Sequence, residues 1–337
     1  MTQKIRFGII GTSPITDAML AGAALYDDLQ LTAVYSRTAE RAAAYAVKYG
    51  AKHTFTSLEA MATAGVIDMV YIASPNLLHM QQTAVFLQNG IHVLCEKPLS
   101  ALPAELEQQY AVADTNRLLL SEAIMFYFQP QTAILQNAIA QIGNIRHVRF
   151  DYAQLSSQYG AVLDGKVPNI FNPALETGAL QDLGIYCVYP ALYFFGMPDG
   201  ITARATTLST GADASTVALL HYPDKQVILS CCKTGQSKVA SEIVGDNGTI
   251  TIGSISKMEN ITLHLTGKDP QKLWGEEAKA VLMGREMHAF SQWIREKTPT
   301  PAYLTLKTLA MQVSVCMHAI RQHAGIIFPR DNEPPRL

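Results

Sequence analysis

Residues 5–16 read IRFGIIGTSPIT, an apolar strand that runs directly into a glycine and a helix start. From there to residue 123, short apolar runs alternate with helical segments. Runs that are apolar almost throughout are typical of parallel strands covered on both faces. The alternation therefore predicts a doubly wound parallel sheet, whose ligands bind beyond the carboxyl ends of its strands. The predicted strands are 5–10, 31–36, 69–73, 92–96 and 118–123, and the predicted helices include 38–49, 57–64 and 79–89.

The turn after the first strand is a degraded version of the dinucleotide-binding motif of Rossmann domains. Of the glycines in Gly-x-Gly-x-x-Gly only Gly11 remains, and Ser13 and Thr16 stand at the other two places. Glycines there permit a tight bend and a close approach of the backbone to a pyrophosphate. Ser13 is small and can donate to a phosphate, but taken alone the segment fits a plain strand-to-helix turn better.

The end of the second strand discriminates between the two nicotinamide dinucleotides. A site for NAD usually places an acid about 20 residues after the glycines. Here Ser36 and Arg37 stand at the strand end, and Arg41 follows one helical turn later. A hydroxyl with guanidinium groups suits a 2′-phosphate, because arginine offers forked, charge-assisted donors. The sequence therefore favours NADP(H) over NAD(H), with an exposed arginine at a helix start as the alternative.

The pattern changes after Pro130, where strands follow one another without intervening helices. This order predicts an α+β domain, a largely antiparallel open sheet flanked by helices. Residues 156–176 contain Gly and Pro and are expected to form an irregular loop that reaches toward the substrate. The predicted strands are 145–154, 201–209, 216–222, 226–233, 241–244, 249–252 and 261–265.

These patterns divide the chain into domains. We predict a dinucleotide-binding domain at residues 1–123 and a substrate-binding and oligomerisation domain at residues 124–303. Residues 304–337 are expected to supply an apolar helix near 304–323 that packs back on the body, and a loose Pro-rich end from residue 331. A length of 337 residues suits two such cores.

The composition argues against several classes of function. Hydrophobic residues make up 48% and charged residues 16%, as in a globular enzyme, and a net charge of −2 without a dense Lys/Arg run argues against nucleic acid as a partner. No secretory signal and no apolar run of bilayer length is present, so we expect a cytoplasmic protein without a membrane partner. The five cysteines form no Cys-x-x-Cys pair, and no cluster has metal-ligand spacing, so no metal is predicted.

Three further stretches carry a resemblance to a known family. ASPNLLH (residues 73–79) follows the third predicted strand, CEKPL (residues 95–99) follows the fourth, and ETGALQDLGIY occupies residues 176–186. Their order and spacing resemble the motifs of the Gfo/Idh/MocA oxidoreductases, and the resemblance extends from about residue 5 to residue 326. It implies a Rossmann domain followed by a domain with a largely antiparallel sheet.

Within that family the chain is most similar to the branch of the dimeric dihydrodiol dehydrogenases and NADP-dependent D-xylose dehydrogenases. The Ser36-Arg37 pair, the segment beginning Glu122-Ala123-Ile124, and Tyr186 where others carry histidine indicate this branch. Those relatives usually carry an arginine after the position of Ile124, whereas here the next residues are Met125, Phe126 and Tyr127. Tyr127 would change the polarity of the substrate pocket, so substrate identity is not carried over.

The resemblance implies hydride transfer between nicotinamide C4 and a carbinol or carbonyl carbon of a sugar, polyol or vicinal diol. A side chain must then give or accept a proton at the same oxygen. Tyrosine has an ordinary pKa of about 10, and a neighbouring ammonium favours the phenolate. We therefore predict Tyr186 as the acid/base and Lys97 as the group that tunes it, with the opposite assignment open. Asp182 would share a helix face with Tyr186 and orient the substrate or Lys97, with a helix-start cap as the alternative.

The expected cofactor is NADP(H), with NAD(H) less favoured. Tyr127 and Asp182 are predicted to bind the substrate, and His79 has a packing or capping role as its alternative. The predicted cofactor-binding residues are Gly11, Thr12, Ser13, Pro14, Ile15, Ser36, Arg37, Arg41, Ser74, Pro75, Asn76, His79, Glu96, Lys97 and Glu122.

Two alternatives to this dehydrogenase remain at the level of sequence. One is a non-catalytic NADP-binding sensor or regulatory protein, and the other is a reductase of another unsaturated bond, such as an imine or a tetrapyrrole bridge. The presence of Lys97, Asp182 and Tyr186 together favours catalysis. The resemblance also implies a small-molecule substrate and a homodimer or higher homo-oligomer formed through the sheet of the second domain.

Overall fold

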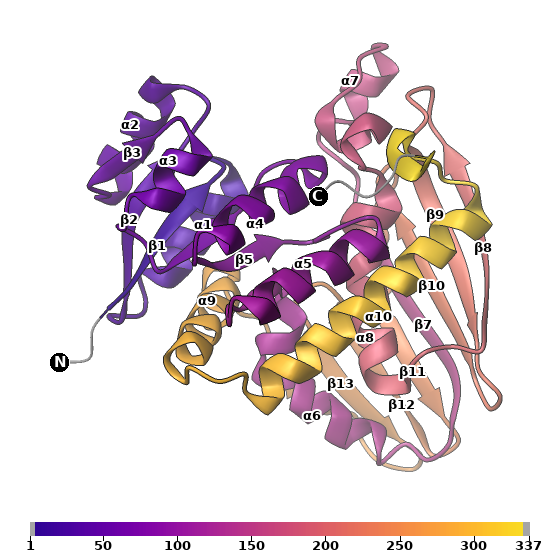
Figure 1. The fold of residues 1–337 in the computed structure, drawn as a ribbon. Coiled ribbons are helices and arrows are strands. Elements are labelled where there is room, and N and C mark those ends of the chain that lie inside the picture. The colour runs from indigo at the N-terminus through magenta and orange to yellow at the C-terminus, as the bar shows by residue number, and fades with distance from the viewer. Residues whose placement is uncertain (1–3, 333–337) are drawn as a thin grey trace. The chain divides into compact units, whose positions relative to one another are not determined.

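The computed structural model describes residues 4–332, and the chain divides into two compact units. Within the described residues, unit 1 comprises 4–128 and 278–308, and unit 2 comprises 129–277 and 309–332. Figure 1 traces the chain by colour from indigo to yellow, and the orange helix α9 (Lys279–Arg295) belongs to unit 1.

Unit 1 is built on a sheet of six strands in the order β3-β2-β1-β4-β5-β6, in which every neighbouring pair is parallel. β4 and β6 are buried along their whole length, so both faces of the sheet are covered. The predicted doubly wound sheet is confirmed. The strands are β1 (Ile5–Ile10), β2 (Leu29–Tyr35), β3 (His53–Phe55), β4 (Met69–Ile72), β5 (His92–Glu96) and β6 (Leu120–Ala123).

The helices of this unit begin and end close to where the sequence predicts. Thr38 caps α2 by accepting from the Arg41 N–H, and Ser57 caps α3 by accepting from the Ala60 N–H. β3 was not predicted, because this three-residue edge strand is mostly exposed and has no apolar run. The helices are α1 (Pro14–Ala23), α2 (Ala39–Tyr49), α3 (Leu58–Thr63), α4 (His79–Gln88) and α5 (Pro103–Thr115).

Helix α9 completes unit 1 by packing on α1. A Cβ on Gly22 would lie 2.3 Å from the Ala280 carbonyl oxygen, and a Cβ on Gly284 would lie 2.6 Å from the Gly22 carbonyl oxygen. The two helices therefore touch backbone to backbone, and α9 buries Met287 and Phe290. The predicted second domain, residues 124–303, differs from unit 2 at its end. Residues 278–308 belong to unit 1, because α9 packs on α1.

The Gly284→Ala variant is expected to lower the free energy of unfolding by about 1–3 kcal/mol, because the new methyl group meets backbone that has no room to move. Gly160→Ala is the matched control, since Gly160 also lies in a helix but a Cβ there meets nothing within 4 Å. Thermal and denaturant unfolding of both variants provide the measurement. Equal stability of the two variants would contradict the close packing of α9 on α1.

Unit 2 contains a sheet of eight strands in the order β14-β13-β12-β11-β7-β10-β9-β8. All its pairings are antiparallel except the one between β7 and β10. The predicted largely antiparallel sheet is confirmed, and β14 is a strand that was not predicted. The strands are β7 (Ile145–Ala153), β8 (Gly200–Thr207), β9 (Asp213–His221), β10 (Gln226–Cys232), β11 (Ser241–Gly245), β12 (Gly248–Ser254), β13 (Glu259–Leu265) and β14 (Gln271–Trp274).

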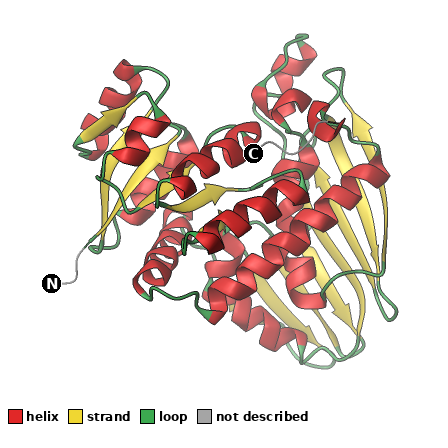
Figure 2. Cartoon of the chain, viewed as in Figure 1, coloured by secondary structure: helices red, strands yellow, loops and turns green. Residues whose placement is uncertain are grey.

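One face of the unit 2 sheet carries the core. Val227, Leu229 and Cys231 alternate along β10 and are buried, whereas Val217 on the neighbouring strand is 49% exposed. In Figure 2 the strands of this unit lie behind α8 and the second half of α10. These helices cover the apolar face and leave the other face open. The helices with residues in unit 2 are α6 (Pro130–Ile139), α7 (Tyr159–Leu163), α8 (Ile185–Phe195) and α10 (Pro301–Ala324).

Two segments are more ordered than the sequence predicts. The expected irregular loop at 156–176 contains α7 and two 3-10 turns, because Phe171 packs on Val162 and Ala212 in a small core of its own. The chain end, expected to be loose from residue 331, is tied to α10 at that residue, since Arg321 donates to the Asp331 carboxylate at 2.5 Å. The remainder of the predicted loose end, residues 333–337, lies outside the described residues.

Candidate active site

The strand ends of unit 1 gather most of the predicted cofactor residues at one edge. Because β1, β2, β4, β5 and β6 are parallel, the segments that follow them lie at the same edge of the sheet. The segments that meet there are Gly11–Ile15 after β1, Ser36 and Arg37 after β2, Ser74–Asn76 after β4 and Lys97 after β5, with Glu122 inside β6.

The turn after β1 depends on its single glycine. Gly11 has a φ of +99°, and a Cβ there would lie 2.3 Å from the Ala73 carbonyl oxygen at the end of β4. The Thr16 hydroxyl donates to the Gly11 carbonyl at 3.1 Å, and Ser13 begins α1 in an extended conformation. The turn therefore brings the backbone and the amino end of α1 to the edge where a pyrophosphate would bind, although two of the motif's glycines are missing.

Arg41 lies against this turn. Its Nε is 2.5 Å from the Thr12 hydroxyl and its Nη2 is 2.7 Å from the Thr12 carbonyl. Ser36, at the end of β2, is buried, and Arg37 is exposed. A guanidinium held beside the glycine turn, with a hydroxyl at the strand end, fits the 2′-phosphate of NADP, whose charge an acidic residue would repel.

The loops after β4 and β5 are joined by His79. This buried ring has its Nδ1 2.8 Å from the Pro98 carbonyl and its Nε2 2.9 Å from the Ser74 carbonyl. Burial lowers the pKa of His79. Both ring nitrogens are engaged by backbone, so His79 supports the two loops. Among the described residues the buried hydroxyl of Ser74 has no partner, which leaves it to a bound group.

Buried carboxyl groups surround the start of the Lys97 loop. The Tyr71 hydroxyl donates to Glu96 at 2.6 Å, and the Leu99 N–H donates to Glu122 at 2.7 Å. Burial raises the pKa of Glu96, and it raises the pKa of Glu286 on α9 well above its usual range, with the Glu96 charge adding to the effect. The sequence did not single out Glu286, because only the packing of α9 brings it to these strands.

The ETGALQDLGIY motif of unit 2 (residues 176–186) presents two side chains and buries the rest. From Glu176 to Leu192 every residue is buried except Asp182 and Tyr186. Asp182 lies in a π-helical turn, Leu180–Gly184, a form often found at functional sites, and Tyr186 lies in the first turn of α8. An acid and a phenol four residues apart are therefore the groups that this segment presents.

The structure gives each of these two residues a neighbour. Asp182 forms an ion pair with Lys233, and because α8 begins only at Ile185, Asp182 is not the helix-start cap that the sequence offered as an alternative. The Tyr186 ring meets the Tyr152 ring edge-on, with 5.7 Å between the ring centres. The sequence alone does not single out Lys233, since nothing in the local pattern after β10 relates it to Asp182.

The first half of this motif is anchored at two points. The buried Asp213 accepts from the Leu180 N–H at 2.7 Å, and a Cβ on Gly178 would lie 1.9 Å from its carboxylate. Glu176 has a φ of +58°, and its buried carboxylate accepts from Arg330 at 3.1 Å. Asp213 and Arg330, far apart in the sequence, thus hold the turn that carries Asp182.

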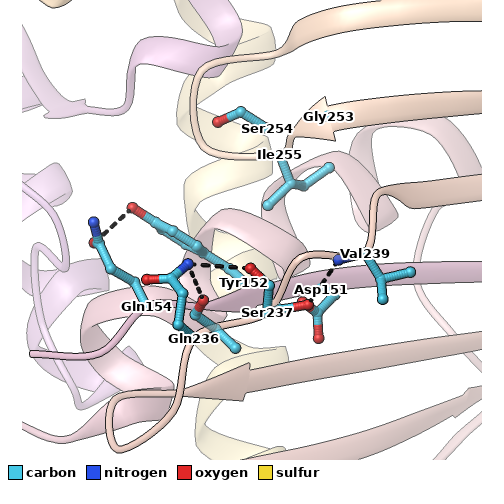
Figure 3. A pocket seen from close by; sticks show the side chains of 10 residues that line it. Asp151, Tyr152, Gln154, Gln236, Ser237, Val239, Gly253, Ser254 and Ile255 are labelled. Carbon is cyan, nitrogen blue, oxygen red and sulfur yellow. Dashed lines mark hydrogen bonds between the residues drawn. The ribbon is translucent and has the colours of Figure 1, made fainter.

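A polar pocket of about 170 Å³ lies beside Tyr152 in unit 2. Figure 3 shows the Gln236 amide bonded to main-chain oxygens and the Tyr152 hydroxyl directed at Gln154, at 3.3 Å. The carboxylate of Asp151 and the hydroxyl of Ser237 also line it. A lining that combines amide, hydroxyl and carboxylate groups suits a ligand with several hydroxyl groups.

Tyr127, predicted to bind the substrate, is tethered within unit 1. Its hydroxyl donates to the Ala302 carbonyl at 2.7 Å, and its ring meets Phe128 edge-on. The bond joins the turn after β6 to the start of α10. A direct contact of Tyr127 with a substrate stays a prediction.

Within residues 4–332 no three His, Cys, Asp or Glu side chains are placed to hold a metal ion. In the same part of the chain, no helix is both long and apolar enough to cross a membrane. The five cysteines are free thiols, and all except Cys232 are buried.

Comparison with known protein families gives two matches, one within each unit. Residues 5–123 match the family described as "Oxidoreductase family, NAD-binding Rossmann fold". Residues 135–251 match the domain family "GFO/IDH/MocA C-terminal domain". The first match contains the glycine turn and Lys97, and the second contains Asp182, Tyr186 and Lys233.

Curated relatives are similar over most of the chain. The chain is 37% identical to the scyllo-inositol 2-dehydrogenase (NADP(+)) of Bacillus subtilis over 97% of this chain and 99% of that protein. It is 31% identical to a trans-1,2-dihydrobenzene-1,2-diol dehydrogenase of Danio rerio, over 66% of each chain. It is also 31% identical to a D-xylose 1-dehydrogenase (NADP(+)) of Haloferax volcanii, over 64% of this chain and 65% of that protein.

Solved structures agree on the fold. The aldose-aldose oxidoreductase of Caulobacter crescentus matches with a TM-score of 0.83 at 20% identity, over 96% of this chain and 98% of that chain. A 3-ketoreductase from Actinomadura kijaniata, solved with NADP and TDP-benzene, matches with a TM-score of 0.82 at 21% identity, over 95% of this chain and 98% of that chain.

Proposed function

The chain belongs to the GFO/IDH/MocA oxidoreductase family, and from that premise we propose that it is an NADP-dependent dehydrogenase of CH–OH groups in a sugar, polyol or vicinal diol. The relatives named for scyllo-inositol, dihydrodiols and D-xylose share this substrate chemistry. The observation that carries the proposal is the segment Glu176–Leu192, which presents only an acid and a phenol. A positioned phenol or carboxyl group can give or accept the proton at a carbinol oxygen.

The residues at the edge of the unit 1 sheet would hold the cofactor. The N–H groups at the start of α1 and the Gly11 turn suit the pyrophosphate, and Ser36 with Arg41 suits the 2′-phosphate. Ser74 offers a buried hydroxyl at the end of β4. Bound NADP supplies the carbon that accepts or donates the hydride, and the protein supplies orientation and the proton path.

Arg41→Ala is expected to raise the KM for NADP(H) about 10- to 100-fold and to leave the KM for NAD(H) almost unchanged, because a charge-assisted hydrogen bond is lost only with the 2′-phosphate. Steady-state kinetics with both cofactors provide the measurement. Lys48→Ala is the control, since Lys48 lies in the same helix but pairs with Asp17. An equal loss with both cofactors would show that Arg41 acts only on the turn.

We assign the proton transfer at the substrate oxygen to Tyr186. Its phenol gives or takes the proton of the substrate oxygen, and the edge contact with Tyr152 limits the directions its ring can take. Lys97 supports the phenolate and bonds the substrate oxygen, and Asp182 orients a neighbouring hydroxyl. The polar pocket beside Tyr152 offers further partners for the hydroxyl groups of the same substrate.

The activity is tested by incubating the protein with NADP⁺ and a panel of inositols, aldoses and trans vicinal diols, and by following NADPH absorbance at several pH values. Turnover of one substrate class with NADP⁺ in preference to NAD⁺ is the expected result. NADPH binding, seen by fluorescence, without turnover of any substrate would favour a sensor instead. Turnover of an imine or a tetrapyrrole alone would favour a reductase of another unsaturated bond.

The assembly is proposed to be a homodimer or a higher homo-oligomer formed through the open face of the unit 2 sheet. On β9 that face carries Val217, 49% exposed, and the partly exposed Leu219, which pairs with Ile228 of β10. Light scattering of wild type and of Val217→Lys tests this assignment. A cytoplasmic location likewise stays a prediction, tested by cell fractionation.

A further inference from the structure

A buried lysine lies against the acidic residue of the candidate active site. Lys233 follows β10, and its backbone is fixed, because its N–H donates to the Ala214 carbonyl and its carbonyl accepts from the Ser156 N–H, each at 2.9 Å. Its side chain is only 6% exposed, and its ammonium donates to Oδ2 of Asp182. The same ammonium lies 5.9 Å from the centre of the Phe171 ring. These contacts hold both the backbone and the side chain of Lys233 in place.

Two carboxylates of unit 2 balance the charge of Lys233. Asp182 binds it directly and is 26% exposed, so one side of this acid reaches the surface. Asp213 is buried, and although burial raises its pKa, the charge of Lys233 is among the influences that lower it. Since Asp213 holds the Leu180 N–H, Lys233 interacts with an anchor of the π-helical turn as well as with the acid inside it.

The ion pair differs from the surface pairs of the same unit. Lys225 pairs with Asp224 with side chains 15% and 68% exposed, and Arg146 pairs with Asp246 with side chains 60% and 41% exposed. Exposed pairs of that kind contribute little, because solvent screens them and each side chain keeps its freedom. A buried ammonium, in contrast, is strongly unfavourable without a partner, so the Lys233–Asp182 geometry is the one that the fold imposes.

We propose that Lys233 is a positioning residue of the active site, which fixes the direction and the charge of the Asp182 carboxylate so that it accepts a hydrogen bond from a substrate hydroxyl beside the Tyr186 phenol. The inference rests on the proposed dehydrogenase function. Lys233 touches neither the transferred hydride nor the proton, and it acts through Asp182.

The test uses the full chain with NADP⁺ and a substrate that the wild type turns over, in the variants K233M, K233R, D182N and D182N/K233M. K233M is expected to lower kcat/KM for the alcohol about 10- to 100-fold, since a misplacement of about 1 Å in a site has effects of that order. The KM for NADP⁺ should not change. K233R should recover part of the loss, and K233M should add less than about 3-fold in the D182N background, because a residue that acts through its neighbour has little effect once the neighbour is gone.

The inference would be overturned if the losses of kcat/KM caused by D182N and K233M multiplied in the double variant. It would also be overturned if K233M were as active as the wild type. A loss of NADPH affinity in K233M that matches its loss of turnover would overturn it as well. K225M is the matched control and should behave as the wild type. If K233M does not fold, the comparison of D182N with D182N/K233M still decides, because the double variant buries no unpaired charge. A wild type without turnover on any substrate refutes the proposed function itself, whereas an active wild type with independent losses refutes only the role of Lys233.

Discussion

The Tyr186→Phe variant is expected to lower kcat for the alcohol about 10²- to 10⁴-fold, the usual contribution of a positioned acid or base. Phe keeps the edge contact with the Tyr152 ring and removes only the hydroxyl, so the fold and the affinity for NADPH should not change. The measurement is kcat across a pH range, with NADPH binding followed by fluorescence. The pH limb that reports ionisation of the phenol should disappear from what activity remains.

Tyr193→Phe is the matched control for this variant. Tyr193 lies further along α8 and is also partly exposed, but it follows the segment in which only Asp182 and Tyr186 are not buried. Its loss of a hydroxyl should leave kcat within about 2-fold of the wild type, as is usual for a substitution away from the chemistry. A Tyr186→Phe enzyme with wild-type kcat would assign the proton to another group, and Lys97 would be the first candidate.

The Lys97→Met variant is expected to lower kcat about 10²- to 10³-fold, the effect of removing one donor that stabilises a developing oxyanion. Lys97 is half-buried at the end of β5 and follows Glu96, which is held by the Tyr71 hydroxyl. Its ammonium should favour the alkoxide form of the substrate oxygen as the hydride leaves. Measuring kcat with and without added primary amines tests whether a free ammonium restores part of the rate.

Lys279→Met separates this role from a general effect of charge. Lys279 begins α9, and its charge, like that of Lys97, lowers the pKa of Glu96 against the larger effect of burial. If Lys97 acted only by balancing the buried carboxyl groups, the two variants would lose activity alike. Retention of activity in Lys279→Met and its loss in Lys97→Met support a direct role for Lys97.

The parallel sheet of unit 1 could be predicted because its strands are buried on both faces and therefore appear as short apolar runs. β1 and β5 have the bounds that the sequence predicts, and the other predicted strands of this sheet differ by one or two residues at their ends. β3 and β14 were not predicted, because each is a short edge strand with exposed residues. The small core around Phe171 was also missed, since it forms from segments that are irregular when considered one at a time.

The predicted cofactor residues could be grouped from the sequence because parallel strands all end at one edge. Gly11 shows the limit of this reasoning. The motif alone could not distinguish a plain turn from a binding turn, and only the structure shows why this glycine is required: it has a φ of +99° and lies against the Ala73 carbonyl. His79 shows another limit, because its two bonds to backbone carbonyls depend on loops that follow different strands.

The sequence by itself determined the family, the sheet of unit 1 and the positions of Lys97, Asp182 and Tyr186 in their motifs, since each of these is encoded by neighbouring residues. Only the tertiary structure decided what surrounds those side chains. Lys233 meets Asp182 across 51 positions of chain, and Glu286 reaches the carboxyl cluster of β5 and β6 through the packing of α9 on α1. Such contacts depend on strand order and on how closely helices approach, and no local pattern of residue types specifies either.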